Sequence, residues 1–170
     1  MNIEMGKYPR ATIAILVAAI VMAGSLIAQD ASIDEALAQA KVIYSQQGPR
    51  AALPEYEKVL AGYRNAGNRH GEAITLGLLG NCYKRLGDYP KALGLLNSAL
   101  TLKRELHDRP EEGKTLSHLG LVYWEQGEYP KAVEAFEQSM AIARELKDIK
   151  LEAASLNNLK IGRASCRERV

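Results

Sequence analysis

The side chains that could carry out chemistry are few and widely spaced in this sequence of 170 residues. Metal ligation and nucleophilic catalysis draw mainly on histidine and cysteine. The chain has three histidines, His70, His107 and His118, and two cysteines, Cys82 and Cys166. The histidines share no metal-binding spacing and have no cysteine partner in a zinc-type pattern. We therefore expect them to be loop and surface residues rather than ligands.

The short motifs that accompany catalysis are also missing from the sequence. It contains no glycine-rich phosphate loop, no H-E-x-x-H pair and no G-x-S-x-G turn. The sequence thus predicts no catalytic residue, no metal site and no cofactor, and this segment is not expected to be an enzyme. The net charge of +2 comes from the last ten residues, which hold three arginines and one glutamate. Without them the chain is neutral, so its charge does not favour a nucleic-acid partner.

The elements that position these side chains repeat with a period of 40 residues. "LGNCYKRLGDYPKAL" and "LGLVYWEQGEYPKAV" are copies of one unit. The matched signature residues are Leu79, Gly80, Tyr83 and Ala92 in one copy, and Leu119, Gly120, Tyr123 and Ala132 in the next. A more diverged copy precedes them and a partial copy follows. The predicted repeats cover about 31–69, 70–109, 110–149 and 150–159.

Each unit is predicted to be a pair of helices joined by a tight turn. Apolar residues follow the i, i+3, i+4 spacing of a helix with one buried face. Gly87 suits the left-handed residue after a helix, and Pro90 suits the first turn of the next one. Gly80 inside a helix costs about 1 kcal/mol relative to alanine, so its recurrence at Gly120 indicates a steric need. Cys82 takes the place of Val122 and is expected to be a small buried apolar residue.

At these positions the sequence resembles the tetratricopeptide repeat family. Leu79-Gly80-x-x-Tyr83 followed by Ala92 looks like its signature, as does the copy that starts at Leu119. The resemblance covers about residues 31–159 and implies an all-α, right-handed solenoid of helix-turn-helix hairpins. The 40-residue period is similar to that of kinesin light chains and of bacterial multi-repeat regulators. The family resemblance implies a protein or peptide partner.

The same resemblance implies which residues line the concave binding groove formed by the first helices. The candidates from the first complete repeat are Ile74, Gly77, Asn81, Lys84 and Arg85. Those from the later repeats are Lys114, Ser117, Leu121, Trp124, Glu125, Ala154 and Asn157. Asn81 and the basic residues could hold a peptide backbone or acidic groups, and Trp124 offers an aromatic anchor. The alternative interpretation is that these are ordinary solvated helix positions.

The N-terminus has the pattern of an export signal. Lys7 and Arg10 precede an apolar run, residues 11–28, and an acidic segment follows. The run is also just long enough to span a bilayer. A cleaved signal peptide, a retained membrane anchor and a buried core helix are the three interpretations. The first two place the repeats outside the cytoplasm, in the periplasm or beyond, and only the anchor brings membrane contact, through residues 11–28.

The C-terminal "IGRASCRERV" departs from the repeat pattern. A continued fourth copy requires glycine and tyrosine where Lys160 and Arg163 stand. The peptide resembles one translated frame of a common sequencing adapter, so residues 160–170 are interpreted as a non-native tail; a genuine basic tail is the alternative. On this interpretation the partial repeat is cut short, leaving Leu156 and Leu159 uncovered and able to drive self-association.

Two hypotheses for function follow. In the first, the chain is an exported interaction scaffold that binds a peptide or another protein in its concave groove. In the second, it is the sensor arm of a larger protein, because exported bacterial arrays of this kind resemble those that precede a caspase-like CHAT peptidase domain. The ligand and the total number of repeats are not encoded in these residues.

Overall fold

The computed structural model describes residues 10–167, apart from the side chains of residues 10–14, 16, 17, 21 and 23–28. The described residues form seven helices and no strand. The helices are α1 (Arg10–Gln47), α2 (Pro49–Ala66), α3 (Arg69–Arg85), α4 (Tyr89–Glu105), α5 (Arg109–Glu125), α6 (Tyr129–Leu146) and α7 (Ile149–Arg167). This is the all-α architecture that the repeat pattern predicts.

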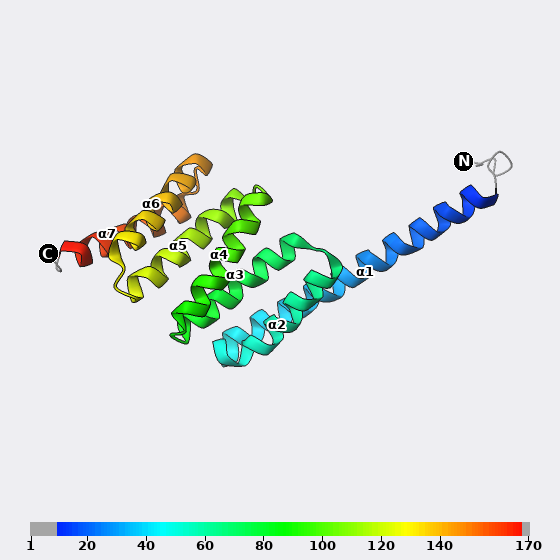
Figure 1. The fold of residues 1–170 in the computed structure, drawn as a ribbon, viewed down its shortest axis with the longest axis horizontal. Helices are drawn as coiled ribbons and strands as arrows, with labels where there is room; N and C mark the ends of the chain where they lie inside the picture. Colours follow the sequence, from blue (N-terminus) through cyan, green and yellow to red (C-terminus); the bar gives the residue numbers. More distant parts are fainter. Residues whose placement is uncertain (1–9, 168–170) are drawn as a thin grey trace.

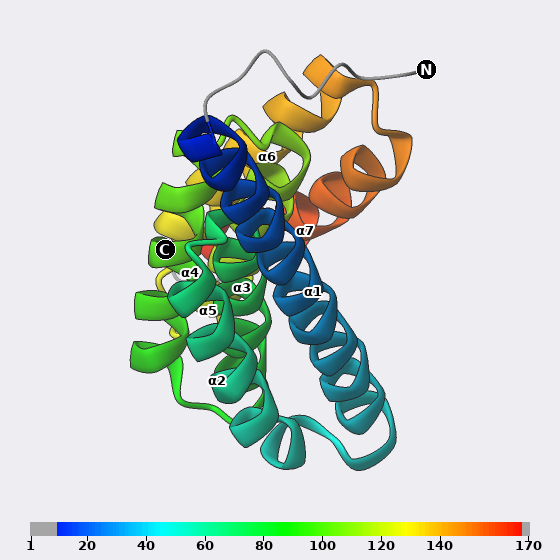
Figure 2. The same cartoon turned by 90° about the vertical axis from the view of Figure 1, so that its right-hand side faces the viewer.

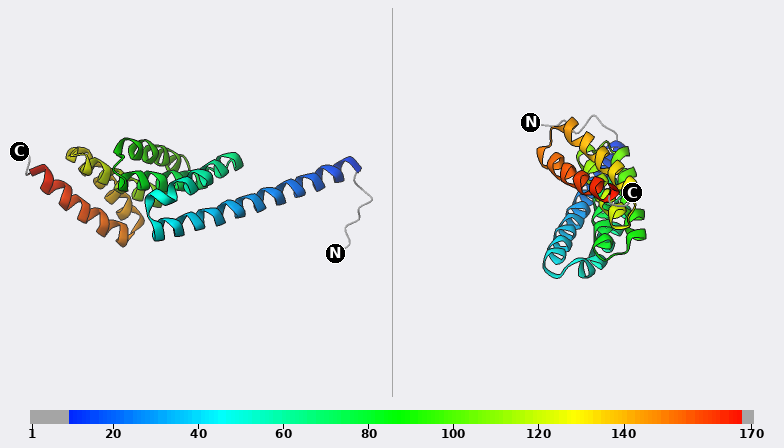
Figure 3. Two further views of the ribbon diagram at one scale, coloured as in Figure 1. Left: turned by 90° about the horizontal axis from the view of Figure 1, so that it is seen from below. Right: turned by 90° about the vertical axis from the view of Figure 1, so that its left-hand side faces the viewer.

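The helices pair into hairpins that stack into a right-handed α-solenoid (Figure 1). α1 packs on α2, α3 on α4 and α5 on α6, while α2 also contacts α3 and α4 contacts α5. α7 packs on α6 and touches α5. The first helices of successive hairpins, α3, α5 and α7, therefore line up beside one another, and the second helices form the opposite layer (Figure 3). The predicted helical hairpins are confirmed.

The turns between helices follow from residues that tolerate the left-handed backbone. Gly87 and Gly127 end the first helices with φ of +80° and +77°. The turns after α4 and α6 place His107 and Lys147 at φ of 55° and 56°, a conformation uncommon for residues other than glycine. Each new helix then starts with a proline in its first turn or an aspartate or asparagine cap.

The helix-interior glycines let two helices of one hairpin pack closely, as their recurrence predicts. A Cβ atom on Gly80 would lie 2.7 Å from Cγ of Leu96 in α4. A Cβ atom on Gly120 would overlap the ring of Phe136 in α6. Both contacts are too short for any side chain larger than hydrogen, so close packing offsets the helix propensity lost at each glycine.

Ion pairs between neighbouring helices repeat with the same period. Arg64 pairs with Glu72, Arg104 with Glu112 and Arg144 with Glu152. Arg69 pairs with Glu105, and Arg109 pairs with Glu145 one repeat later. Most of these pairs are exposed and contribute little each, but Glu112 is only 5% exposed and binds two arginines.

The N-terminal half of α1 extends beyond the stack (Figure 1), while its C-terminal half packs against α2 (Figure 2). In the extended part the side chains of Ile15 and Ile20 are 69% and 67% exposed. Most of the predicted export segment, residues 1–28, lies outside the described residues, either entirely or for its side chains. Within the described residues, no helix combines the length and apolarity that crossing a bilayer requires.

The last helix corrects one expectation about the C-terminal end. α7 runs to Arg167, so the segment that departs from the repeat pattern is helical. Leu159 was expected to be uncovered, yet it is 2% exposed because it packs with Ala132 and Phe136. Leu156 is 45% exposed, whereas its counterpart Leu116 is 4% exposed under α6. Only one of the two leucines is therefore left uncovered.

Candidate functional site

A small cavity of about 100 Å³ opens between the first helices α3 and α5. α3 contributes Ile74, Gly77, Leu78 and Asn81, and α4 and α5 contribute Lys103, Glu111, Lys114, Thr115 and His118. The structure thus brings together four groove positions that the family resemblance implies: Ile74, Gly77, Asn81 and Lys114. It adds a group of charged and polar side chains that the sequence did not single out.

The floor of the cavity carries a buried ammonium group. Lys103 is 3% exposed and reaches in from α4, a second helix. Its Nζ donates to Oγ1 of Thr115 over 2.8 Å and lies 3.4 Å from Oε2 of Glu111. Gly77 of α3 lies beside it, where a Cβ would be in ordinary van der Waals contact with Nζ at 3.4 Å. Burial lowers the pKa of Lys103, and the carboxylate of Glu111 opposes this shift.

Glu111 links this buried lysine to the rim. Its other oxygen, Oε1, accepts a 2.6 Å hydrogen bond from Nζ of Lys114, which is exposed. Burial alone would raise the pKa of Glu111, but the ammonium groups of Lys114 and Lys103 hold it below its ordinary value. Lys103, Glu111 and Lys114 therefore form a charged chain from the floor of the cavity to solvent.

His118 corrects the expectation that all three histidines are loop or surface residues. It lies inside α5 and lines the cavity. Burial lowers the pKa of His118 to about 4, and the positive charges of Lys84, Lys103 and Lys114 contribute. The imidazole is consequently neutral at pH 7. Periodicity alone could not reveal this, because the burial depends on how closely α3 and α4 approach α5.

The charged residues of this cavity occur at one interface between repeats. Forty residues earlier, the positions of Lys103, Glu111, Lys114 and His118 hold Tyr63, Gly71, Ile74 and Leu78. Forty residues later they hold Ala143, Leu151, Ala154 and Asn158. None of these counterparts is charged. The fold therefore forms the preceding and the following interface without charges at these four positions, and this comparison is the sequence signal that could have identified the cavity.

A second, mostly apolar cavity of about 70 Å³ lies between α5 and α7. Leu121 and Trp124, both predicted groove residues, line it together with Phe136, Asn158 and Ile161. The indole Nε1 of Trp124 donates to Oγ of Ser165 over 3.0 Å, and the ring is half-buried. Trp124 therefore packs against α7 rather than standing free in the groove.

Ser117 is a correction to the predicted groove. Its side chain is 8% exposed and lies 3.0 Å from Oγ of Ser139 in α6. Ser139 in turn donates to the carbonyl of Gly113 over 2.8 Å and lies 2.9 Å from Oγ of Ser155 in α7. The three serines form a buried polar row that joins α5, α6 and α7, so Ser117 is not available to a ligand.

The remaining groove candidates lie apart from the two cavities. Lys84 is half-buried, and burial lowers its pKa although Glu125 acts in the opposite direction. Arg85 is exposed, donates to Oη of Tyr44 over 3.2 Å and covers that ring, which ties α3 to α1. Asn157 is exposed on α7 and lines neither cavity.

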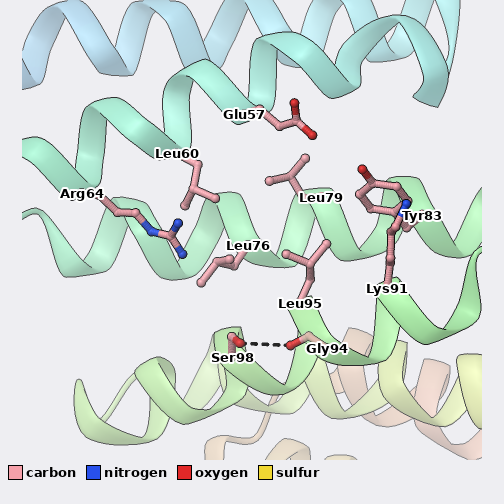
Figure 4. Close-up of a pocket in the computed structure, with 10 residues that line it drawn as sticks. All are labelled: Glu57, Leu60, Arg64, Leu76, Leu79, Tyr83, Lys91, Gly94, Leu95 and Ser98. Atoms are coloured by element: carbon pink, nitrogen blue, oxygen red, sulfur yellow. Dashed lines mark hydrogen bonds between the residues drawn. The ribbon is translucent and has the colours of Figure 1, made fainter.

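The opposite layer of the solenoid carries a larger hollow of about 500 Å³ between α2 and α4 (Figure 4). Leu60, Leu76, Leu79 and Leu95 form its apolar wall. The equivalent hollow one repeat later measures about 290 Å³ and is lined by the same ten positions shifted by 40. Glu134 and Gln138 fill part of it where Gly94 and Ser98 leave the first one open. This hollow is a periodic consequence of the stacking.

Several solved structures share this fold. The chain superposes on a signal transduction ATPase with a tetratricopeptide repeat sensor from Pyrococcus horikoshii with a TM-score of 0.71 and 20% identity, over 76% of this chain and 20% of the other. Kinesin-light-chain repeats from Podosopora anserina give a TM-score of 0.68 and 18% identity, over 79% and 66%. The N-terminal domain of stress-induced protein-1 from C. elegans gives 0.56 and 18%, over 74% and 95%.

The chain thus spans a fifth of the archaeal protein and about two thirds of the fungal one. A search of curated proteins found no match. The tetratricopeptide repeat family matches residues 32–105, 99–145 and 111–161, which together run from the C-terminal part of α1 to the first two thirds of α7. The chain belongs to the tetratricopeptide repeat family.

Proposed function

We propose that this protein is an exported scaffold that binds a partner protein along the concave groove of α3, α5 and α7. Repeat folds of this kind offer interaction surfaces rather than enclosed catalytic sites. The observation that carries the proposal is the change of chemistry at one interface. The repeats agree in their packing residues, yet the neighbouring repeats hold uncharged residues at the positions of Lys103, Glu111, Lys114 and His118, which gather at this one cavity.

An extended peptide segment fits this groove better than a compact ligand. The two groove cavities measure about 100 and 70 Å³, each the size of one side chain rather than of a whole small molecule. The first of them lies between successive first helices, so a peptide lying along the groove could place one side chain in it. Asn81 lines the first cavity without a hydrogen bond to another described residue, which leaves its amide for a peptide backbone.

The export part of the proposal rests on the N-terminal sequence. A positive flank, an apolar run over residues 11–28 and an acidic start to the repeats are the features of a secretory signal. If the same segment is retained as an inner-membrane anchor, the repeats still lie outside the cytoplasm. Mass spectrometry of the mature protein tests it: a new N-terminus near Gln29 supports cleavage, and an intact Met1 in a membrane-free cytosolic fraction contradicts export.

Capture of partners by the full chain tests the groove. Photo-crosslinking groups placed at Asn81 and at Lys114 should label a partner protein from the exported fraction of the source cells. The same group at Lys58 on α2, in the opposite layer, is the matched control. The double variant Lys84→Ala/Arg85→Ala and the single variant Trp124→Ala should each reduce the yield. Equal labelling from Lys58, or full capture by both variants, contradicts the groove as the binding surface.

A second candidate function is the sensor arm of a larger protein. The archaeal neighbour is described as a signal transduction ATPase whose tetratricopeptide repeats act as a sensor, and this chain spans a fifth of its length. The reading frame downstream of the repeats decides between the two. A following α/β domain with a histidine and cysteine pair, as in CHAT peptidases, supports the sensor arm, and a stop after a polar capping helix supports the scaffold.

A further inference from the structure

The hollow between α2 and α4, in the layer opposite the concave groove, owes its size to two small side chains. The stacking forms a hollow at this place in successive repeats, but the second one contains Glu134 and Gln138 where the first has Gly94 and Ser98. The first hollow measures about 500 Å³ and the second about 290 Å³. The larger volume lies well within the range of about 300–1,000 Å³ that is typical of pockets for small ligands.

Packing within the protein does not require a glycine at the position of Gly94. A Cβ atom built there would have no other atom within 4 Å, whereas at Gly80 and Gly120 it would overlap a side chain of the facing helix. Glycine inside a helix is also less favourable than alanine. The missing side chain of Gly94 therefore improves neither the core nor the helix, and the space that it leaves is part of the hollow.

The middle of the hollow is apolar and held in place by the core. Leu60, Leu76 and Leu79 are buried, and Leu95 of α4 is half-buried against the same cluster. In Figure 4 these four leucines meet in the middle of the hollow. Because core packing fixes these side chains, the hollow is formed before a ligand binds and offers it apolar contact.

One end of the hollow carries an excess of negative charge. Glu57 lies toward the end that holds Tyr83 and Lys91 (Figure 4), and it makes no hydrogen bond or ion pair with another described residue. Nζ of Lys91 lies 3.1 Å from a carboxylate oxygen of Asp88. The hydrogen bond with Asp88 and, more weakly, the charge of Glu57 raise the pKa of Lys91. Two carboxylates thus face one ammonium group, so this end attracts a further cation.

The other end of the hollow offers hydrogen-bond donors. Nε of Arg64 donates to Oε1 of Glu72 over 2.7 Å, while its two terminal nitrogens make no hydrogen bond with another described residue. In Figure 4 the guanidinium group points toward Leu76, and Ser98 lies at the same end on α4. A guanidinium group with free N–H groups is a preferred partner of a carboxylate. The two ends of the hollow therefore favour groups of opposite charge.

The distance between the two ends sets the length of a ligand that reaches both. Glu57 and Arg64 are seven residues apart on α2, which is about 10 Å at the helical rise of about 1.5 Å per residue. Lys91 and Ser98 have the same spacing on α4. An extended peptide of about three residues has this length.

We infer that this hollow is a second binding site, which takes a short apolar peptide with free ends. The α-ammonium group of the peptide lies at Glu57, its carboxylate at Arg64, and its side chains lie against the four leucines. The opposite charges at the two ends, their separation and the space at Gly94 carry the assignment. The site lies outside the concave groove, so it goes beyond the proposed function and does not depend on it.

Isothermal titration calorimetry of the full chain with trileucine tests the site. N-acetyl-trileucine lacks the ammonium group and trileucine amide lacks the carboxylate. Each should bind about tenfold more weakly than trileucine, the usual size of one lost charge-assisted hydrogen bond. Dileucine is too short to reach both ends and should lose about the same factor.

A variant at each end should remove the response to one blocking group. Glu57→Gln should bind trileucine about tenfold more weakly and should no longer distinguish it from N-acetyl-trileucine. Arg64→Gln should likewise no longer distinguish trileucine from trileucine amide. Glu55→Gln is the matched control, because it removes one charge from α2 outside the hollow. It should change the affinity less than about twofold.

The double variant Gly94→Glu/Ser98→Gln should lose trileucine binding, because it copies the side chains that narrow the second hollow. The fold accommodates those side chains one repeat later, so circular dichroism should show unchanged helicity. If this variant nevertheless fails to fold, Glu57→Gln keeps the test valid because Glu57 is exposed. The peptide site is overturned if the wild type does not bind trileucine or binds its blocked forms equally well. Equal losses in Glu55→Gln and Glu57→Gln, or unchanged binding by a folded double variant, overturn it as well.

Discussion

The Nζ atom of Lys103 in α4 lies 2.8 Å from Oγ1 of Thr115 in α5, beside Gly77 of α3. One side chain from the outer layer of the solenoid thus reaches the floor of the groove between two inner helices. Its counterparts Tyr63 and Ala143 are buried at the same place in the other repeats. The cavity between α3 and α5 is therefore lined by residues of three helices, and its chemistry depends on a residue of α4 as well as on residues of the first helices.

The stability of the protein should depend on pH through His118. Its pKa of about 4 in the fold is below the ordinary 6.5, so the unfolded chain takes up a proton first as the pH falls. Stability is thus lost between pH 6.5 and pH 4, by about 2 kcal/mol from pH 7.5 to pH 5. Urea unfolding of the wild type and His118→Asn at both pH values measures this. Equal losses in the two proteins contradict it.

Replacing either of two glycines of the α3–α4 hairpin by alanine should change protein stability in opposite directions. Gly80→Ala places a Cβ 2.7 Å from Leu96 and should destabilise the protein by about 1–3 kcal/mol. Gly94 in α4 has no atom within 4 Å of a built Cβ. Gly94→Ala should therefore stabilise by about 0.5–1 kcal/mol through helix propensity. Thermal unfolding followed by circular dichroism compares them, and a loss of stability in both variants would refute the distinction.

Glu112 should be the most sensitive member of the ion-pair network. Its carboxylate accepts from Arg104 Nε over 2.9 Å and from Arg109 Nη1 over 2.7 Å, and it is nearly buried. Glu112→Gln should cost about 1–3 kcal/mol, against less than about 0.5 kcal/mol for Glu55→Gln, whose partner Lys58 is exposed. Chemical denaturation gives both values. Similar costs at the two positions would show that burial of Glu112 is unimportant.

The carboxylate of Glu112 should also make the stability of the protein depend on pH in the acid range. Burial alone would raise the pKa of Glu112, but hydrogen bonds from Arg104 and Arg109 hold it below the ordinary value. The stability that Glu112 contributes is therefore complete above its ordinary pKa and is lost as the pH falls through its lowered pKa in the fold. Lowering the pH below 4.5 should therefore reduce the free energy of unfolding of the wild type more than that of Glu112→Gln, which chemical denaturation at each pH measures.

Ser139 should be essential to the packing of α7. Its hydroxyl contacts the Gly113 carbonyl, Ser117 and Ser155 in a site with no exposure. Ser139→Ala leaves these buried groups short of a partner and should cost about 1–3 kcal/mol. Ser98→Ala, which removes an exposed hydroxyl bonded within α4, should change stability little. Hydrogen exchange should show α7 opening first in Ser139→Ala, and uniform protection would contradict the role.

The repeat pattern determined most of the fold because its signals are local. Helical periodicity, Gly87 and Pro90 depend on residues a few positions apart, so the helices and turns could be predicted without tertiary information. The steric role of Gly80 could be predicted as well, because the position recurs at Gly120. The groove residues Asn81 and Lys114 followed from family resemblance, and the structure places them together at one cavity.

The sequence by itself thus determined the family and the helical hairpins. Only the tertiary structure decided which side chains reach the groove. Lys103 reaches the cavity from a second helix, His118 lines it half-buried, Ser117 is bonded to Ser139 instead, and Leu159 is covered by Phe136. Each of these outcomes depends on how closely helices far apart in sequence approach one another, a distance set by the packing of all their side chains together rather than by the spacing of residues along one helix.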